Sequence, residues 1–449
     1  MENTAGPGRE LLSLALPALG ALMAEPLYVL ADTAVVGHLG TVPLAGLAIA
    51  STALLIGYNV CIFLAYGSTA TVARLMGADL RAAAANQAIQ GLWLATGLGV
   101  ALAVFGATFT RPLLVLLGAD GDVLDAATTY FRISLLGAPG MLLMLSGVGY
   151  LRGTKDTVRP LWVGVGTAAV NLAIELVLIY GLGLGIGASA VATVIAQWLG
   201  AGFYLLWIGR EVGRYEVTLR PDPAAIRRLM VIGADLLVRT MSLVGTFTLA
   251  TAMAARIGTV ELAAHQIAFQ TWFLLAMAMD AMAIAAQTLV GNQLGSGSAD
   301  EARQTGNQVI KWSIGIGVTL GSMLTTVILA GGDLIAGIFS TDPGVVVVGG
   351  FLMLHVATMA PLSGLAFALD GILIGAGDQR FLAQAMGTSF AIFVAASVVG
   401  RVLGLGIGWL WGAIWLFMTV RSALLYSRFR GTRWQIVGTT GRLGGHAHG

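Results

Sequence analysis

The stretch MAEPLYVLADTAVVGHLG at residues 23–40 carries two acidic residues inside the first long apolar run of the chain. Glu25 and Asp32 lie seven positions apart, so an α-helix, with about 3.6 residues per turn, places them on nearly the same face. At the centre of a bilayer each carboxylate would cost about 2.5 to 3.5 kcal/mol on an insertion scale. Acids at that depth are therefore candidates for function.

The composition of the whole chain is that of a membrane protein. Of its 449 residues, 57% are hydrophobic and only 10% are charged, whereas soluble chains carry about 25% charged residues. We therefore reject a soluble protein of long helices. A span needs about 20 apolar residues, and the chain offers twelve such segments, near 11–36, 43–72, 84–108, 126–151, 158–181, 185–208, 229–255, 260–294, 308–330, 346–374, 380–400 and 403–426.

The distribution of Lys and Arg predicts the orientation of the spans. If the even-numbered loops and both termini lie on one side, that side holds nineteen of the 24 cations, Arg421 among them. The opposite side holds three, and two fall inside spans. Because cytoplasmic loops are enriched in Lys and Arg, both termini are expected in the cytoplasm, and the membrane is expected to be the cytoplasmic (inner) one.

The chain contains an internal repeat. HLGTVPLAGLAIA at 38–50 matches RIGTVELAAHQIA at 256–268 in seven of thirteen positions, and RGTKD at 152–156 corresponds to IGAGD at 374–378. Six spans per repeat is an even number, so both halves enter the membrane from the same face. The expected fold is an all-α polytopic membrane protein whose twelve transmembrane helices form two six-helix lobes related by a pseudo-twofold axis along the membrane normal. The expected parts are an N-terminal lobe at 1–208, a cytoplasmic linker at 209–228, a C-terminal lobe at 229–428 and a tail at 429–449.

Several of these segments resemble one transporter family. ALPALGALMAEPLYVLADTAVVGHLG, YLRGTKD, LAAHQIA and LDGILIGAGD, in this order along the chain, are similar to the MATE family (multidrug and toxic compound extrusion). AMDAMAIAAQTLVG and DLLVRT resemble its DinF-like branch. The resemblance covers about residues 10 to 425. It implies export of organic cations or amphiphiles, driven by inward flow of H⁺ or Na⁺.

One group of polar residues lies in the outer half of the first lobe. Asp32 falls in the outer part of the first span and Glu175 in the outer half of the fifth, with Asn171 one turn before Glu175 on the same face. The resemblance agrees, because proton-coupled members carry an acid where Asp32 stands, and an Asn and an acid where Asn171 and Glu175 stand. Thr193 matches a further polar member of that pocket.

Proton exchange is the chemistry expected of this group. Desolvation disfavours a charged carboxylate, and two neighbouring carboxylates can share one proton. We expect Asp32 and Glu175 to exchange a proton between the two sides of the membrane. Glu25 is expected to face the interior of the first lobe, where it either extends the relay or is satisfied by a neighbouring helix end.

A second group lies in the inner half of the second lobe and consists of Arg239, Asp280 and Asp370. A guanidinium does not escape burial by losing its proton, so Arg239 is predicted to contact Asp280 or Asp370 in a mainly structural cluster. Some Na⁺-coupled members use an acid where Asp370 stands and pair it with a Glu in the seventh span. Here the aligned region near Leu243 has no acid, which favours H⁺ over Na⁺.

The sequence thus predicts a secondary active multidrug efflux antiporter that works by alternating access and is coupled to H⁺. The alternatives are a Na⁺-coupled antiporter and a lipid-precursor flippase of the wider superfamily. No enzyme, bound cofactor or metal site is expected, since no nucleophile or metal-ligand constellation is present. The expected partners are a small organic cation or amphiphile and the lipid bilayer, with no nucleic acid, and the expected assembly is a monomer.

Overall fold

The computed structural model describes residues 7–331 and 340–439, and these contain helices and no strands. Twelve of the helical segments are long and apolar enough to cross a membrane, as the sequence predicts. The helices are α1 (Pro7–Gly37), α2 (Thr41–Cys61), α3 (Phe63–Gly77), α4 (Arg81–Thr108), α5 (Thr110–Leu116), α6 (Gly121–Ser134), α7 (Ala138–Gly153), α8 (Val158–Leu176), α9 (Ile186–Arg214), α10 (Pro223–Ile257), α11 (Thr259–Gly295), α12 (Ala299–Gly331), α14 (Pro343–Gly375), α15 (Gln379–Val402) and α16 (Ile407–Arg430). Two short elements, η1 (Leu135–Gly137) and the π-helical η2 (Val177–Gly181), complete them. Residues 440–449 of the expected tail lie outside the described residues.

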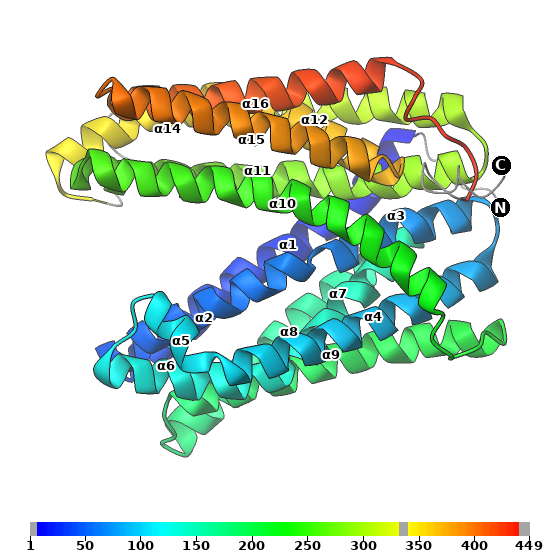
Figure 1. The fold of residues 1–449 in the computed structure, drawn as a ribbon, viewed down its shortest axis with the longest axis horizontal. Helices are drawn as coiled ribbons and strands as arrows, with labels where there is room; N and C mark the ends of the chain where they lie inside the picture. The colour runs from blue at the N-terminus through cyan, green and yellow to red at the C-terminus, as the bar shows by residue number, and fades with distance from the viewer. Residues whose placement is uncertain (1–6, 332–339, 440–449) are drawn as a thin grey trace. The chain divides into compact units, whose positions relative to one another are not determined.

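The chain forms two compact units (Figure 1). The N-terminal unit is Leu16–Gly233, and the C-terminal unit combines Ala234–Gly449 with Met1–Ala15. The division therefore passes through α1 and through α10. Of the stretch 209–228 between the predicted lobes, only residues 215–222 lie outside helices.

Glycine allows the helices of the N-terminal unit to approach closely. A methyl group at Gly149 of α7 would lie 2.6 Å from the carbonyl oxygen of Ala65 in α3. At Gly99 of α4 it would lie 2.5 Å from the Cα atom of Pro139 at the start of α7. Small residues at such crossings let helix backbones pack without large side chains between them, as membrane helices require.

The C-terminal unit has a larger aromatic core. Trp272, Trp411, Phe393 and Phe417 are buried together within it, on α11, α15 and α16. α14 packs along α11 and α12, and its first turn is capped by Asp342, whose carboxylate accepts hydrogen bonds from the next residues' amides. Pro343 follows at the first helical position, where a missing N–H costs nothing.

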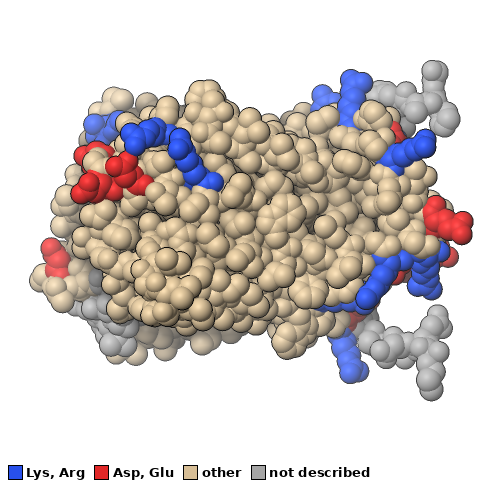
Figure 2. Space-filling view, turned by 90° about the horizontal axis from the view of Figure 1, so that it is seen from below, with Lys and Arg blue, Asp and Glu red and all other residues tan. Residues whose placement is uncertain are grey.

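One face of the molecule has little charge in its middle. On the face seen in Figure 2, Lys, Arg, Asp and Glu lie toward the two ends of the view, and the surface between them is largely free of charge. Many exposed side chains of the helices are apolar, including Leu27, Leu30, Val104, Leu206 and Met323. Such a surface suits a hydrocarbon environment and not water.

Candidate functional site

Asp32 is buried in the N-terminal unit, and a serine donates to it. The carboxylate is 5% exposed, and its Oδ1 accepts a hydrogen bond of 2.7 Å from the hydroxyl of Ser189 on α9. Close by, Val35 of α1, Ile179 of η2 and Ala188 of α9 form a small apolar cluster. This cluster shields the site from one side, so the hydroxyl of Ser189 replaces a water that Asp32 would otherwise need.

Asn171, Tyr28 and Thr193 form a closed triangle of hydrogen bonds beside Asp32. The side-chain amide of Asn171 donates to the Tyr28 hydroxyl at 3.1 Å and to the Thr193 hydroxyl at 3.0 Å. Thr193 donates to the carbonyl oxygen of Ser189 at 3.1 Å. Since a hydroxyl has one proton to donate, Tyr28 must be the donor in the 3.0 Å contact between Tyr28 and Thr193.

Glu175 lies at the end of α8 with no hydrogen-bond partner in the described part of the chain. Its side chain is fully buried, and neither carboxyl oxygen meets hydrogen-bonding geometry. The Asp32 carboxylate nevertheless lies near enough to repel its charge, and Asp32 and Ser189 both lie within reach of a weak side-chain interaction with it. The π-helical turn η2 begins two residues later, and such turns are frequent at functional sites. The structure thus places Glu175, Asn171, Thr193 and Asp32 in one unit and around one buried point.

Glu25 belongs to the N-terminal unit, but the helices of that unit do not enclose its side chain as the sequence predicts. Its side chain is exposed, and no residue of α1 from 19 to 31 is buried. Burial in this part of α1 begins at Asp32 and continues at Val35 and Val36. Helical periodicity puts Glu25 and Asp32 on one face, but the neighbouring helices cover that face only near its C-terminal end.

A cluster of opposite charges lies in the C-terminal unit. Arg239 of α10 forms an ion pair with Asp370 of α14 through its Nη2, and its Nε donates to the same oxygen at 3.1 Å. The contact with Asp370 that the sequence predicts for Arg239 is therefore present. Arg421 of α16 donates to that oxygen as well, at 2.6 Å, and stacks on the ring of Phe367 at 5.5 Å. Asp280 is half-buried and acts on Arg421 electrostatically.

The assignment of Arg421 to the cytoplasmic surface is wrong. Its side chain is fully buried within α16, nine residues before the helix ends. Two guanidinium groups therefore share the Asp370 carboxylate, and Asp280 supplies a second negative charge. The four formal charges cancel, which makes a buried cluster of this size tolerable.

Three further residues belong to these sites, although the sequence analysis does not assign them there. Tyr28 lies one turn before Asp32, and Ser189 lies one turn before Thr193, so the spacing of four positions could have found both. Arg421 gave no such signal, because it is close enough to a helix end to be taken for a cytoplasmic charge. The sequence points first to the acidic residues of a span. The hydroxyl groups that donate hydrogen bonds at the site are identified only from the folded structure.

Comparison with known proteins agrees with this architecture. The MatE family model matches residues 17–177 and 236–399, one match within each compact unit. Protein DETOXIFICATION 44, chloroplastic, of Arabidopsis thaliana is 32% identical, over 92% of this chain and 80% of its own length. DNA damage-inducible protein F of Escherichia coli is 28% identical, over 94% of this chain and 92% of its own.

The fold is also found among solved structures. A MOP superfamily transporter from Pyrococcus furiosus superposes with a TM-score of 0.84 at 21% sequence identity, covering 94% of this chain and 95% of its own. A structure of MATE in the bent conformation gives a TM-score of 0.85, also at 21% identity, over 94% and 95% of the two chains. Members of the MatE family are transporters, so the protein is a multi-pass membrane transporter of small molecules and not an enzyme. The chain belongs to the MatE family of transporters.

Proposed function

We propose that the protein exports small organic cations or amphiphiles in exchange for H⁺, with Asp32 and Glu175 as the proton-carrying pair. The observation that carries the proposal is the full burial of Glu175 beside Asp32 without a hydrogen-bond partner among the described residues. The names of relatives point the same way, because one of them, from Xanthomonas axonopodis, is a probable multidrug resistance protein.

The surroundings of the two carboxyl groups favour different protonation states. An ionised carboxylate that is buried without a partner is very costly, so Glu175 is neutral in the arrangement described. Asp32 accepts from Ser189, and such a donor favours an ionised acceptor. The pair therefore holds one proton, and its gain or loss of a proton must change the contacts between α1, α8 and α9. This is the coupling that an antiporter needs.

The C-terminal unit offers less to a coupling ion. A Na⁺ ion at Asp370 would lie beside the two guanidinium groups that already pair with this carboxylate, and their positive charges disfavour a further cation there. Because they are paired with Asp370, Arg239 and Arg421 do not present an open basic surface to a pyrophosphate, as a lipid-precursor flippase would need. These contacts support H⁺ over Na⁺ and efflux over lipid transfer.

Transport by purified protein in liposomes tests the proposal. We expect uptake of a fluorescent organic cation when an H⁺ gradient alone is imposed, and none with a Na⁺ gradient alone. Asp32→Asn and Glu175→Gln should each abolish the gradient-driven signal. Asp120→Asn is the matched control, because Asp120 is an exposed carboxylate of the same unit whose side chain makes no cap hydrogen bond.

Two results would contradict this function. Uptake that depends on the Na⁺ gradient and not on pH would show that the coupling ion is Na⁺ and not H⁺. Undiminished H⁺-driven uptake in both carboxyl variants would remove the pair from the mechanism. A circular dichroism spectrum and a gel-filtration profile of each variant show that a lost signal is not lost folding, and the latter also tests the expected monomer.

We further propose that the protein lies in the cytoplasmic membrane with both termini in the cytoplasm. The excess of Lys and Arg on one side of the spans supports this orientation. A reporter that is active only in the cytoplasm, fused to the C-terminus, should be active. If a C-terminal reporter that is active only outside the cytoplasm is active instead, the proposed orientation is reversed.

A further inference from the structure

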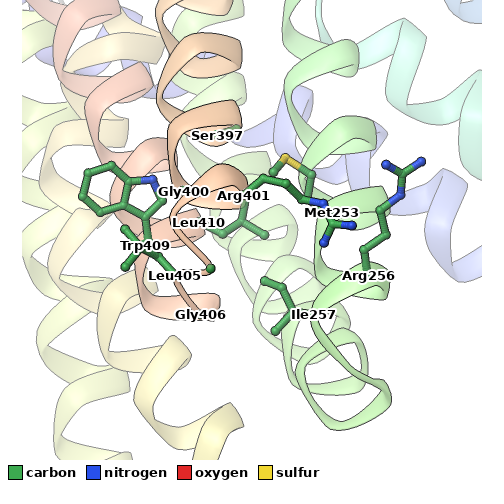
Figure 3. Close-up of a pocket in the computed structure, with 11 residues that line it drawn as sticks. Met253, Arg256, Ile257, Ser397, Gly400, Arg401, Leu405, Gly406, Trp409 and Leu410 are labelled. Carbon is green, nitrogen blue, oxygen red and sulfur yellow. The ribbon is translucent and has the colours of Figure 1, made fainter.

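A cavity of about 230 Å³ lies in the C-terminal unit where three helices end together. Arg256 and Ile257 come from the last turn of α10, Gly400 and Arg401 from the last turn of α15, and Gly406 from the start of α16. Figure 3 shows Arg401 extending from α15 toward α10, which carries Arg256. The proposed proton pair lies in the other unit, so this cavity has no part in it.

The cavity carries positive charge without a counterion. Arg256 and Arg401 line it, and no Asp or Glu is among its described lining residues. None of the ion pairs within the described residues involves either guanidinium. A basic residue in the last turn of a helix is favoured by the helix dipole, which accounts for each Arg singly. It does not account for two like charges that line one hollow.

The turn before α16 adds no negative charge to the same cavity. Gly406 is the N-cap of α16 and provides no side-chain acceptor, and the first turn carries no acid. Gly404 and Gly406 line the cavity, and a Cβ atom at either would meet nothing within 4 Å, so the backbone there is open to a ligand.

A buried serine hydroxyl provides a second and independent sign of a ligand. Ser397 of α15 is 1% exposed and lines the cavity, yet its Oγ has no hydrogen-bond partner in the described structure. A serine within a helix can bond to the carbonyl oxygen four residues earlier, and this one does not. Buried polar groups are paired in nearly all cases, so a ligand in the cavity is the expected partner.

A second cavity in the protein shows what a satisfied basic pocket looks like. It lies in the N-terminal unit and is lined by Arg81, Arg159, Arg214 and also Glu211. Arg81 pairs with Asp79 and Arg159 with Asp156, both at 3.2 Å. Charges of both signs are therefore present there. Of these two cavities, the α10–α15–α16 cavity is the one whose described charged lining residues are all cationic.

We propose that the α10–α15–α16 cavity binds a phosphate group, held by Arg256, Arg401 and Ser397. Guanidinium forks match phosphate oxygens in geometry and charge, and the Ser397 hydroxyl adds a neutral donor. The group can belong to a phospholipid head or to a soluble phosphate. The cavity lies at helix ends and the surface around it is apolar, with Leu405 and Trp409 exposed, which suits a lipid head.

Ligand-dependent thermal stability distinguishes the two sources. Purified full-length protein in detergent is titrated with phosphatidylglycerol, with inorganic phosphate and with diacylglycerol, which has the acyl chains but no phosphate. A phosphate site predicts a rising unfolding temperature with phosphatidylglycerol and not with diacylglycerol. A rise with inorganic phosphate as well assigns the site to phosphate in general, and its absence assigns the site to the lipid head.

Variants assign the effect to this cavity. Arg256→Gln and Arg401→Gln should each weaken the apparent affinity about tenfold, the size expected for one hydrogen bond between charged groups. The double variant should lose the response. Arg81→Gln with Arg159→Gln is the matched control, since it removes two guanidinium groups from the second cavity and should leave the affinity unchanged.

The proposal fails on either of two results. Equal affinity of the double variant and the wild type for every phosphate probe would place binding elsewhere. Equal stabilisation by diacylglycerol and phosphatidylglycerol would show that the acyl chains alone are bound. If the double variant does not fold, Ser397→Ala and Arg401→Lys replace it, because both keep the net charge of the helix ends. Unchanged affinity in both then overturns the site.

Discussion

Removal of the Asp370 carboxylate should destabilise the protein strongly. Asp370 is 1% exposed and its Oδ2 accepts from Arg421 at 2.6 Å and from Arg239. In Asp370→Asn the two guanidinium groups stay buried and lose their shared counterion. Breaking a buried ion pair in this way costs about 3 to 5 kcal/mol. Asp280 still acts on Arg421, so we expect the lower end, about 3 kcal/mol.

An exposed pair of nearly the same length provides the control. Arg111 and Asp125 are 2.7 Å apart, but their side chains are 60% and 70% exposed. Exposed pairs contribute about 0 to 1 kcal/mol, so Asp125→Asn should have little effect. The comparison keeps the type of ion pair and nearly the same distance, and it differs in burial and in the number of guanidinium groups, which is two at Asp370 and one at Asp125.

Equilibrium unfolding in mixed micelles measures both free energies. A triple variant replaces Arg239, Asp370 and Arg421 together by apolar residues of similar size and leaves only the half-buried Asp280 charged. It should recover part of the stability, because one partly exposed charge replaces two buried guanidinium groups without their counterion. The reasoning is refuted if Asp370→Asn is no more destabilising than Asp125→Asn. It is also refuted if the triple variant is less stable than Asp370→Asn.

Three further changes separate other parts of the interpretation. Glu25→Gln should leave transport and its pH profile near normal in the liposome assay, because Glu25 is exposed; a shifted optimum would restore it to the relay. Ser189→Ala removes the 2.7 Å donor to Asp32 and should slow H⁺-driven uptake without abolishing it, since such a bond contributes about 1.5 to 3 kcal/mol; an unchanged rate would make the bond incidental. Gly371→Ala places a methyl group against a carbonyl oxygen of α11 and should cost about 1 to 3 kcal/mol in unfolding. Gly387→Ala, where a Cβ meets nothing within 4 Å, should cost nothing, and equal losses in the two would contradict the packing argument.

The spans could be predicted from the sequence because a bilayer imposes a length and a composition on each helix. The contact between Arg239 and Asp370 could be predicted for a similar reason. A guanidinium that stays charged must find a carboxylate at its own depth, and few were available. Both predictions rest on the large free-energy cost of placing polar or charged groups in the bilayer without partners, which outweighs local sequence preferences.

Arg421 and Glu25 show where such reasoning ends. A hydropathy pattern predicts that a charged side chain near a helix end reaches water. It gives the same prediction for Arg421, whose guanidinium points inward to Asp370. Periodicity gives the face of Glu25 but not what covers that face, and the residues of α1 between 19 and 31 are only half-buried or exposed. Burial depends on neighbouring helices, which a single segment does not encode.

The two units use buried carboxyl groups in opposite ways. In the C-terminal unit, Asp370 faces two guanidinium groups, so its negative charge is held and protonation would leave both cations unpaired. In the N-terminal unit, Asp32 accepts from the Ser189 hydroxyl and Glu175 lies beside it, and no cation takes part in the described contacts. A carboxyl pair with neutral donors can change its protonation without leaving an opposite charge behind. Proton exchange is therefore expected in the N-terminal unit, and the C-terminal cluster is expected to stay charged throughout the transport cycle.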